Sequence, residues 1–224
     1  MNQDKKPLAL VVLLENIGHI QGFNLTQWMM DTVDFVTEEY AKVLLRLLGA
    51  YRQYDRVIIL EDEEANASAL TNALIENSRT HQIDTLLLVH GYEHMLLGYK
   101  GKEYVGPETF TPLVEAYQKD PTLLDLRMVY GLNCYGASLA PCWLDLGAKA
   151  VNGAVGVNCM PEPSLSVFLF QWLRGKPYSQ AVQQSSHIAH KWWRQIWRPD
   201  QDGCEHINVS GSRQIIFGQS DITI

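Results

Sequence analysis

The chain alternates between short apolar runs of strand length and longer segments in which apolar residues recur with the period of a helix. The first run, Leu8–Leu14, is apolar throughout, as expected of a strand buried on both faces of a parallel sheet. Similar runs predict further strands at Arg56–Glu61, Thr85–Val89, Arg127–Leu132 and Lys149–Val157, and a last extended segment at Arg213–Phe217. Strands that alternate with helices predict right-handed crossovers, and hence an α/β fold with a mostly parallel sheet of about six strands.

The segments between these runs are predicted to be helices. In Trp28–Leu48 apolar residues recur every three or four positions, and Gly49 is a typical residue just beyond a helix C-terminus. Further helices are predicted at Asn66–Arg79, Thr111–Lys119, Leu139–Leu146, Ser164–Arg174 and Pro177–Trp197.

The stretch from Gly91 to Thr111 departs from this alternation, because glycines and a proline separate short apolar patches. It predicts a hairpin in which Leu96–Tyr99 pairs with Glu103–Val105 and the chain turns at Lys100-Gly101.

Composition favours one globular domain spanning residues 1–224. The chain has 224 residues, of which 46% are hydrophobic and 19% charged, enough to bury a full core, and it shows no repeat or low-complexity tract. The net charge of −7 disfavours binding to nucleic-acid phosphates or anionic membranes. The first apolar run is too short to cross a membrane and lacks the cleavage site of a signal peptide, so we expect a cytoplasmic protein.

The cysteines and histidines show no arrangement typical of a metal site. The four cysteines contain no CxxC pair: Cys134, Cys142, Cys159 and Cys204. His187 and His190 are three residues apart, but two histidines alone do not supply a ligand set for a metal. We therefore expect neither a metal nor another cofactor.

Two polar residues follow strands that are predicted to be close in the sheet. His90 comes directly after one apolar run and Cys134 follows another. Because the carboxyl ends of parallel strands meet at one edge of the sheet, where such folds place their ligands, the two side chains are predicted to form a thiol–imidazole dyad. His94, beyond Gly91 in the predicted hairpin, is the second choice for the base.

The chemistry of this dyad is nucleophilic. A free thiol has a pKa of about 8.5, so an imidazole must take its proton or pair with the thiolate, and can later protonate a leaving amine. The backbone N–H groups of Gly91 and Cys134 are candidate donors to an oxyanion. Gly136 is expected to relieve crowding in the turn after the thiol and to let a substrate backbone approach.

The sequence Leu86–Gly91 and the sequence Val129–Gly136 together resemble the caspase-like cysteine peptidases, a group that includes metacaspases, legumains, gingipains and CHAT domains. Cys134 follows His90 by 44 residues, close to the separation of about 50 in caspases. Trp143–Gly153 is also similar to the helix-to-strand passage after the nucleophile in CHAT domains. The resemblance implies a three-layer caspase-like sandwich with a small hairpin after the catalytic histidine, and a cysteine endopeptidase that acts on a protein or peptide, with a regulatory protein as a possible partner.

Two residues depart from the caspase pattern. Leu132 stands where caspases have a glutamine that helps to select aspartate, and Asn133 stands where alanine or serine is usual, so aspartate specificity does not carry over. Glu15, at the end of the first predicted strand, is instead a candidate for binding an arginine or lysine side chain, although a solvated loop residue is the simpler interpretation. A neutral pocket is the alternative, with selectivity from asparagines: Asn16, Asn133 and Asn158.

Two other functional classes remain open. The same domain can be catalytically silent and serve in protein assembly or regulation. An α/β-hydrolase esterase is a further alternative, with Cys134 as nucleophile and Asp202 and His206 downstream, but its G-x-S/C-x-G elbow requires a glycine two positions before the nucleophile, whereas Gly131 stands three before it.

Overall fold

The computed structural model describes residues 6–15, 27–158, 160–200, 202–219 and 221–224, with side chains of the first helix described from residue 38 onward. Within these residues the main sheet has six strands in the order β2-β1-β3-β7-β8-β9. The first five strands of this order are mutually parallel, and β9 is antiparallel to β8. The bounds are β1 Leu8–Glu15, β2 Arg56–Leu60, β3 Gln82–Val89, β7 Leu126–Gly131, β8 Ala150–Ala154 and β9 Gln214–Gly218. The predicted mostly parallel sheet is confirmed.

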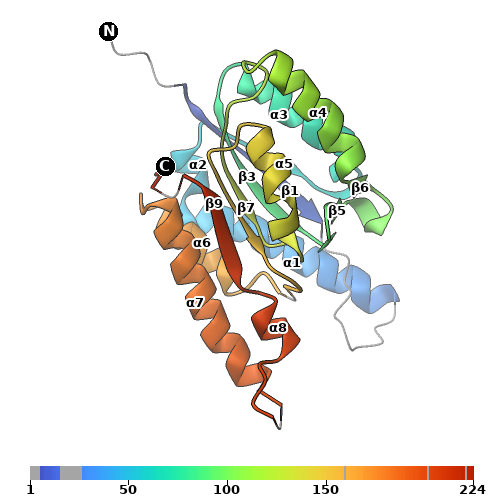
Figure 1. The fold of residues 1–224 in the computed structure, drawn as a ribbon, viewed down its shortest axis with the longest axis vertical. Helices are drawn as coiled ribbons and strands as arrows, with labels where there is room; N and C mark the ends of the chain where they lie inside the picture. Colours follow the sequence, from blue (N-terminus) through green and yellow to red (C-terminus); the bar gives the residue numbers. More distant parts are fainter. Residues whose placement is uncertain (1–5, 16–26, 159, 201, 220) are drawn as a thin grey trace.

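Helices cover both faces of this sheet and make a three-layer sandwich (Figure 1). One face is covered by α3 Ala67–Ser78, α4 Pro107–Lys119 and α5 Ala140–Asp145. The other is covered by α1 Gln27–Leu48, α2 Ala50–Gln53, α6 Ser164–Trp172 and α7 Tyr178–Ile196. Successive side chains of β1 alternate between the two cores, because neighbouring residues of a strand point to opposite faces. The buried apolar run therefore reflects two cores that share one sheet.

A second, three-stranded sheet follows His90. It consists of β4 Gly91–Tyr92, β5 Met95–Leu97 and β6 Tyr104–Val105, all antiparallel, and the 3₁₀ helix η2 Tyr99–Gly101 forms the turn before β6. The predicted hairpin is confirmed, and the short strand that starts at Gly91 is an addition to it. Its pairing with β5 holds in place the main chain that directly follows His90.

Several helix boundaries differ from those predicted. Helix α4 begins at Pro107 and not at Thr111, because proline suits a first helical position, where its missing N–H needs no partner. Pro177 was expected inside α7 but lies just before it. Four short elements were not predicted as separate pieces: α2, α8 Ile207–Ser210, and the 3₁₀ helices η1 Asp62–Glu64 and η3 Gly136–Leu139.

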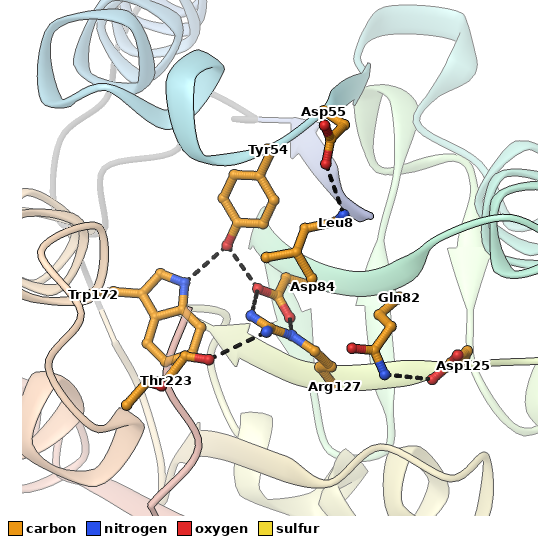
Figure 2. A network of polar contacts seen from close by, with 9 residues as sticks. All are labelled: Leu8, Tyr54, Asp55, Gln82, Asp84, Asp125, Arg127, Trp172 and Thr223. Carbon is orange, nitrogen blue, oxygen red and sulfur yellow. Dashed lines mark hydrogen bonds and ion pairs between the residues drawn. The ribbon is translucent and has the colours of Figure 1, made fainter. Parts of the chain in front are cut away.

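A buried polar network explains why β3 begins at Gln82 and not at the predicted Thr85 (Figure 2). Arg127 on β7 donates from Nε and Nη2 to the two carboxylate oxygens of Asp84 on β3, at 3.0 and 2.7 Å. The hydroxyl of Tyr54 donates to the same carboxylate at 2.7 Å and accepts from Trp172 Nε1 at 2.8 Å. Arg127 Nη1 also donates to the carbonyl of Thr223 at 3.2 Å. A charged residue can thus occupy a core strand because its partner lies on the next strand.

No helix in the described part of the chain is long and apolar enough to cross a membrane.

Candidate active site

The turn that carries Cys134 lies against the neighbouring strand β8. Strand β7 ends at Gly131, and Tyr135 then adopts a left-handed conformation with φ of 54° before η3 begins. A Cβ atom on Gly136 would lie 3.1 Å from the Cα of Gly153, and one on Gly153 would lie 2.2 Å from the carbonyl carbon of Gly136. The expected crowding at Gly136 is therefore present, and it comes both from β8 and from the Asn133 side chain within the turn, 3.2 Å from such a Cβ atom.

The chain at His90 and Gly91 runs directly against this turn. His90 follows β3, the strand that pairs with β7, and its side chain is half-buried. A Cβ atom on Gly91 would lie 2.7 Å from the carbonyl oxygen of Cys134 and 3.0 Å from Nδ2 of Asn133. Only a residue without a side chain allows this approach. The two strand ends that the sequence singled out therefore meet.

His90 and Cys134 line one cavity of about 150 Å³. It lies at the carboxyl ends of β1, β3 and β7, the edge at which open α/β sheets bind ligands. The side chains of Leu14, Ala41, Leu88, Leu132 and Leu165 give much of its wall an apolar character. A thiol, an imidazole and a largely apolar pocket thus share one space.

The Cys134 sulfur is held by the main chain of Asn158. Asn158 N–H donates to Sγ at 3.2 Å, and Sγ lies 3.6 Å from the carbonyl oxygen of Asn158, to which the thiol can donate. Burial raises the pKa of the Cys134 thiol, and the Asn158 N–H acts in the opposite direction because it stabilises the thiolate. The isolated side chain is therefore a poor nucleophile, and its activation requires a base.

Two carboxylates line the same cavity. Glu15, the last residue of β1, is only 5% exposed and lies beside Val89, the residue before His90. Its Oε1 accepts the N–H of Lys100 at 2.9 Å, so the interpretation as a solvated loop residue is wrong. Glu162 was missed by the sequence analysis, because the turn-like sequence Pro161-Glu162-Pro163 carries no periodic signal.

The Glu162 carboxylate sits in a local hydrogen-bond arrangement. Its Oε1 accepts Ser166 N–H at 3.2 Å and its Oε2 accepts the Ser166 hydroxyl at 2.6 Å. Burial raises the pKa of Glu162, while the hydrogen bonds from Ser166 and Tyr40 oppose the rise. A cationic side chain entering the cavity would therefore meet an anion that is partly shielded from water.

The asparagines proposed for substrate selection occupy different places. Asn133 is 2% exposed and donates from Nδ2 to the carbonyl of Cys134 at 3.2 Å, a position beneath the turn. Asn158 lines the cavity, but its Nδ2 donates to the carbonyl of Leu132 at 2.7 Å. Asn16 lies outside the described residues.

Three other described histidines make contacts away from the Cys134 sulfur: His94, His190 and His206. His94 is exposed at the tip of the β4–β5 turn, where its main-chain N–H donates to the Ser138 hydroxyl at 2.7 Å. His190 Nε2 lies 3.1 Å from a Glu205 oxygen. His206 Nδ1 accepts the N–H of Asn208 at 3.2 Å and begins α8, so the residue needed for the α/β-hydrolase alternative is outside the cavity that Cys134 lines.

Comparison with known proteins identifies solved structures with a similar fold. No family model and no curated protein matches the sequence. Among solved structures, the chain is similar to the Arg-specific cysteine proteinase gingipain R, with a TM-score of 0.61 and 13% identity, over 98% of this chain and 48% of that one. The fold is caspase-like. A complex of the pro- and mature domains of the same proteinase from Porphyromonas gingivalis gives a TM-score of 0.54 and 12% identity, over 96% of this chain and 47% of that one.

The chain therefore spans about half the length of the solved structures that it matches. The match shows a likeness of fold to gingipain R. Identities of 12 and 13% leave the chemistry of this chain to be argued from its own residues.

Proposed function

We propose that this protein is a cysteine endopeptidase in which Cys134 is the nucleophile and His90 the acid–base group. The observation that carries the proposal is that both side chains, from the ends of neighbouring strands, line one cavity. The approach of Gly91 to the Cys134 carbonyl, which holds the two strand ends together, supports it. Gingipain R, a cysteine proteinase, has a similar fold and supports the same class of reaction.

The reaction follows from the chemistry of the two groups. An imidazole nitrogen of His90 takes the thiol proton, and the sulfur forms a bond to the carbonyl carbon of the scissile amide. The resulting oxyanion accepts hydrogen bonds from the backbone N–H groups of Gly91 and Cys134. The C–N bond then breaks, and the imidazolium returns its proton to the leaving amine. Water, deprotonated by the same imidazole, adds to the thioester carbon; the C–S bond breaks, the acid is released, and the imidazolium returns its proton to the thiolate.

We further propose that the cavity accepts an arginine or lysine before the scissile bond. Glu15 and Glu162 place two carboxylates among largely apolar walls, and a charge-assisted hydrogen bond gains strength when water is partly excluded. Arginine can bind one carboxylate through two parallel hydrogen bonds, so it is expected to be preferred to lysine.

A catalytically silent domain that serves in protein assembly or regulation is the second candidate. One observation favours it: burial raises the pKa of the Cys134 thiol, and the sulfur lies within reach of the Asn158 carbonyl. A thiol that stays protonated in this position would not attack an amide.

Brief labelling with iodoacetamide near neutral pH, followed by mass spectrometric mapping, separates the two candidates. An activated dyad predicts that the half-buried Cys134 is modified before the exposed Cys204 and the half-buried Cys142. Modification ordered by exposure alone, with Cys204 first and Cys134 slow, would support the silent domain.

A further inference from the structure

The loop between β8 and α6 holds the nucleophile turn at three points. Tyr135 N–H donates to the carbonyl of Gly156 at 2.8 Å. Asn158 N–H donates to the sulfur of Cys134 at 3.2 Å, and the Asn158 side-chain amide donates to the carbonyl of Leu132 at 2.7 Å. The contacts lie two residues before the thiol, at the thiol and on the residue after it, so the loop and the turn form one unit.

Within this unit Asn158 has two separate functions. Its Nδ2 atom, buried with the residue 7% exposed, ties the loop to the end of β7 two residues before the thiol. Its main-chain N–H faces the sulfur itself. The side-chain bond fixes where the main chain lies, and the main chain is what contacts the reacting atom.

The two contacts at the sulfur respond differently to ionisation. While the thiol is protonated it can donate to the Asn158 carbonyl. When His90 removes the proton, that bond disappears and the N–H to sulfur bond becomes charge-assisted, which makes it stronger. It also opposes the effect of burial, which raises the pKa of the Cys134 thiol.

We propose that Asn158 is a positioning residue: its side-chain amide, anchored on the Leu132 carbonyl, holds its own N–H group against Cys134 and so stabilises the thiolate that the reaction requires. This inference rests on the proposed function of Cys134 as the nucleophile. It differs from direct substrate selection, because the side-chain amide of Asn158 acts on the protein itself through its bond to the Leu132 carbonyl.

Asn158→Ala tests the inference, with Asn158→Leu as a second variant that keeps the approximate shape of the side chain but loses the donor and adds no charge. Asn77→Ala is the matched control, because Asn77 is 4% exposed and its Nδ2 also donates to a main-chain carbonyl, that of Ala73, at 2.7 Å. The measurement is the iodoacetamide labelling rate of Cys134 as a function of pH, with the melting temperature of each variant.

We expect both Asn158 variants to raise the labelling pKa of Cys134 by about one unit, which slows labelling near neutral pH about tenfold, since a hydrogen bond to a charged group is worth that much. Asn77→Ala should leave the labelling pKa unchanged. An unchanged pKa in both Asn158 variants would overturn the inference, as would an equal shift in Asn77→Ala. Peptide cleavage by the unsubstituted protein is measured separately. If that protein cleaves peptides but the labelling pKa of Cys134 is the same in the Asn158 variants, only the positioning function of Asn158 fails. If the unsubstituted protein cleaves no peptide, the proposed function fails.

Discussion

A methyl group on Gly91 would lie 2.7 Å from the carbonyl oxygen of Cys134, closer than such atoms approach in folded proteins. The main chain at Gly91, the residue after the proposed base, therefore lies directly beside the main chain of Cys134, the proposed nucleophile. Gly91→Ala must push the two strand ends apart, at a cost of about 1–3 kcal/mol. We expect at least a tenfold loss of kcat/KM for peptide-amide hydrolysis, because misplacement by about an ångström is costly to catalysis.

Gly49→Ala is the control for this prediction. Gly49 has φ of 92° and open space around its Cα, so alanine there adds backbone strain of about 1–2 kcal/mol without touching the cavity. Its melting temperature should fall while kcat/KM stays unchanged. Equal activity of the two variants would mean that the approach of Gly91 to Cys134 has no bearing on the reaction.

His90→Ala should lower kcat/KM by about 10²–10⁴-fold, the contribution typical of a positioned acid–base group. His94→Ala, His187→Ala and His190→Ala should each change it by less than about threefold, because these residues do not line the cavity. Steady-state kinetics of the four purified variants check the prediction. A larger loss in His94→Ala than in His90→Ala would reassign the base to the β4–β5 turn.

The carboxylates of the cavity are tested with two peptides that differ only in arginine or its neutral isostere citrulline before the scissile bond. Glu162→Gln should reduce the arginine-to-citrulline ratio of kcat/KM about tenfold or more, since a charge-assisted bond is lost. Glu15→Gln should reduce the ratio as well, and should also weaken the bond to Lys100 N–H, seen as a lower melting temperature. A ratio near one in the unsubstituted protein would refute the basic-substrate proposal and favour a neutral pocket.

The same ratio should depend on pH in a defined direction. Burial raises the pKa of Glu162, so its charge is present above that raised value and is lost as the pH falls through it, earlier than for an ordinary glutamate. Ser166→Ala removes the hydroxyl hydrogen bond that favours the charged form of Glu162 and keeps the main-chain one, so the loss of arginine selectivity should shift to still higher pH. If Ser166→Ala does not shift the pH dependence of the arginine-to-citrulline ratio, Glu162 does not take part in substrate selection.

The buried ion pair between β3 and β7 is predicted to matter for stability and not for the chemistry. Asp84→Asn leaves the Arg127 guanidinium buried without its counterion and should cost about 3–5 kcal/mol. Lys6→Ala breaks the more exposed pair with Asp125 and should cost less than about 1 kcal/mol. Denaturant unfolding of both variants measures the loss in the free energy of unfolding. Similar losses in the two variants would show that burial does not determine how much an ion pair contributes.

The alternation of apolar runs and helical periods was sufficient to predict the main sheet, because strands buried on both faces leave a clear signal. It failed at the beginning of β3, where Asp84 looks unlike a core residue until it is paired with Arg127, which was correctly placed in the next strand of the sheet. Asn66, by contrast, was correctly placed at the start of α3, where its side chain accepts Ala69 N–H.

For the candidate site, the ends of apolar runs identified the places of His90, Cys134 and Glu15. The contribution of Glu162 and the anchoring of Asn158 could not be read in the same way, because both lie in an aperiodic loop whose contacts with β7 and α6 are made only in three dimensions. Proximity of this kind depends on the path of the loop, which carries no repeating pattern.

The central claim is tested most directly by kcat/KM for a fluorogenic peptide amide with arginine before the leaving group, measured for the unsubstituted protein, Cys134→Ala and Cys142→Ala. The account predicts measurable hydrolysis, its abolition in Cys134→Ala with a nearly unchanged melting temperature, and full retention in Cys142→Ala, whose half-buried thiol lies outside the cavity. Hydrolysis that persists in Cys134→Ala, or a folded protein that cleaves no peptide amide of a positional-scanning library, would contradict it.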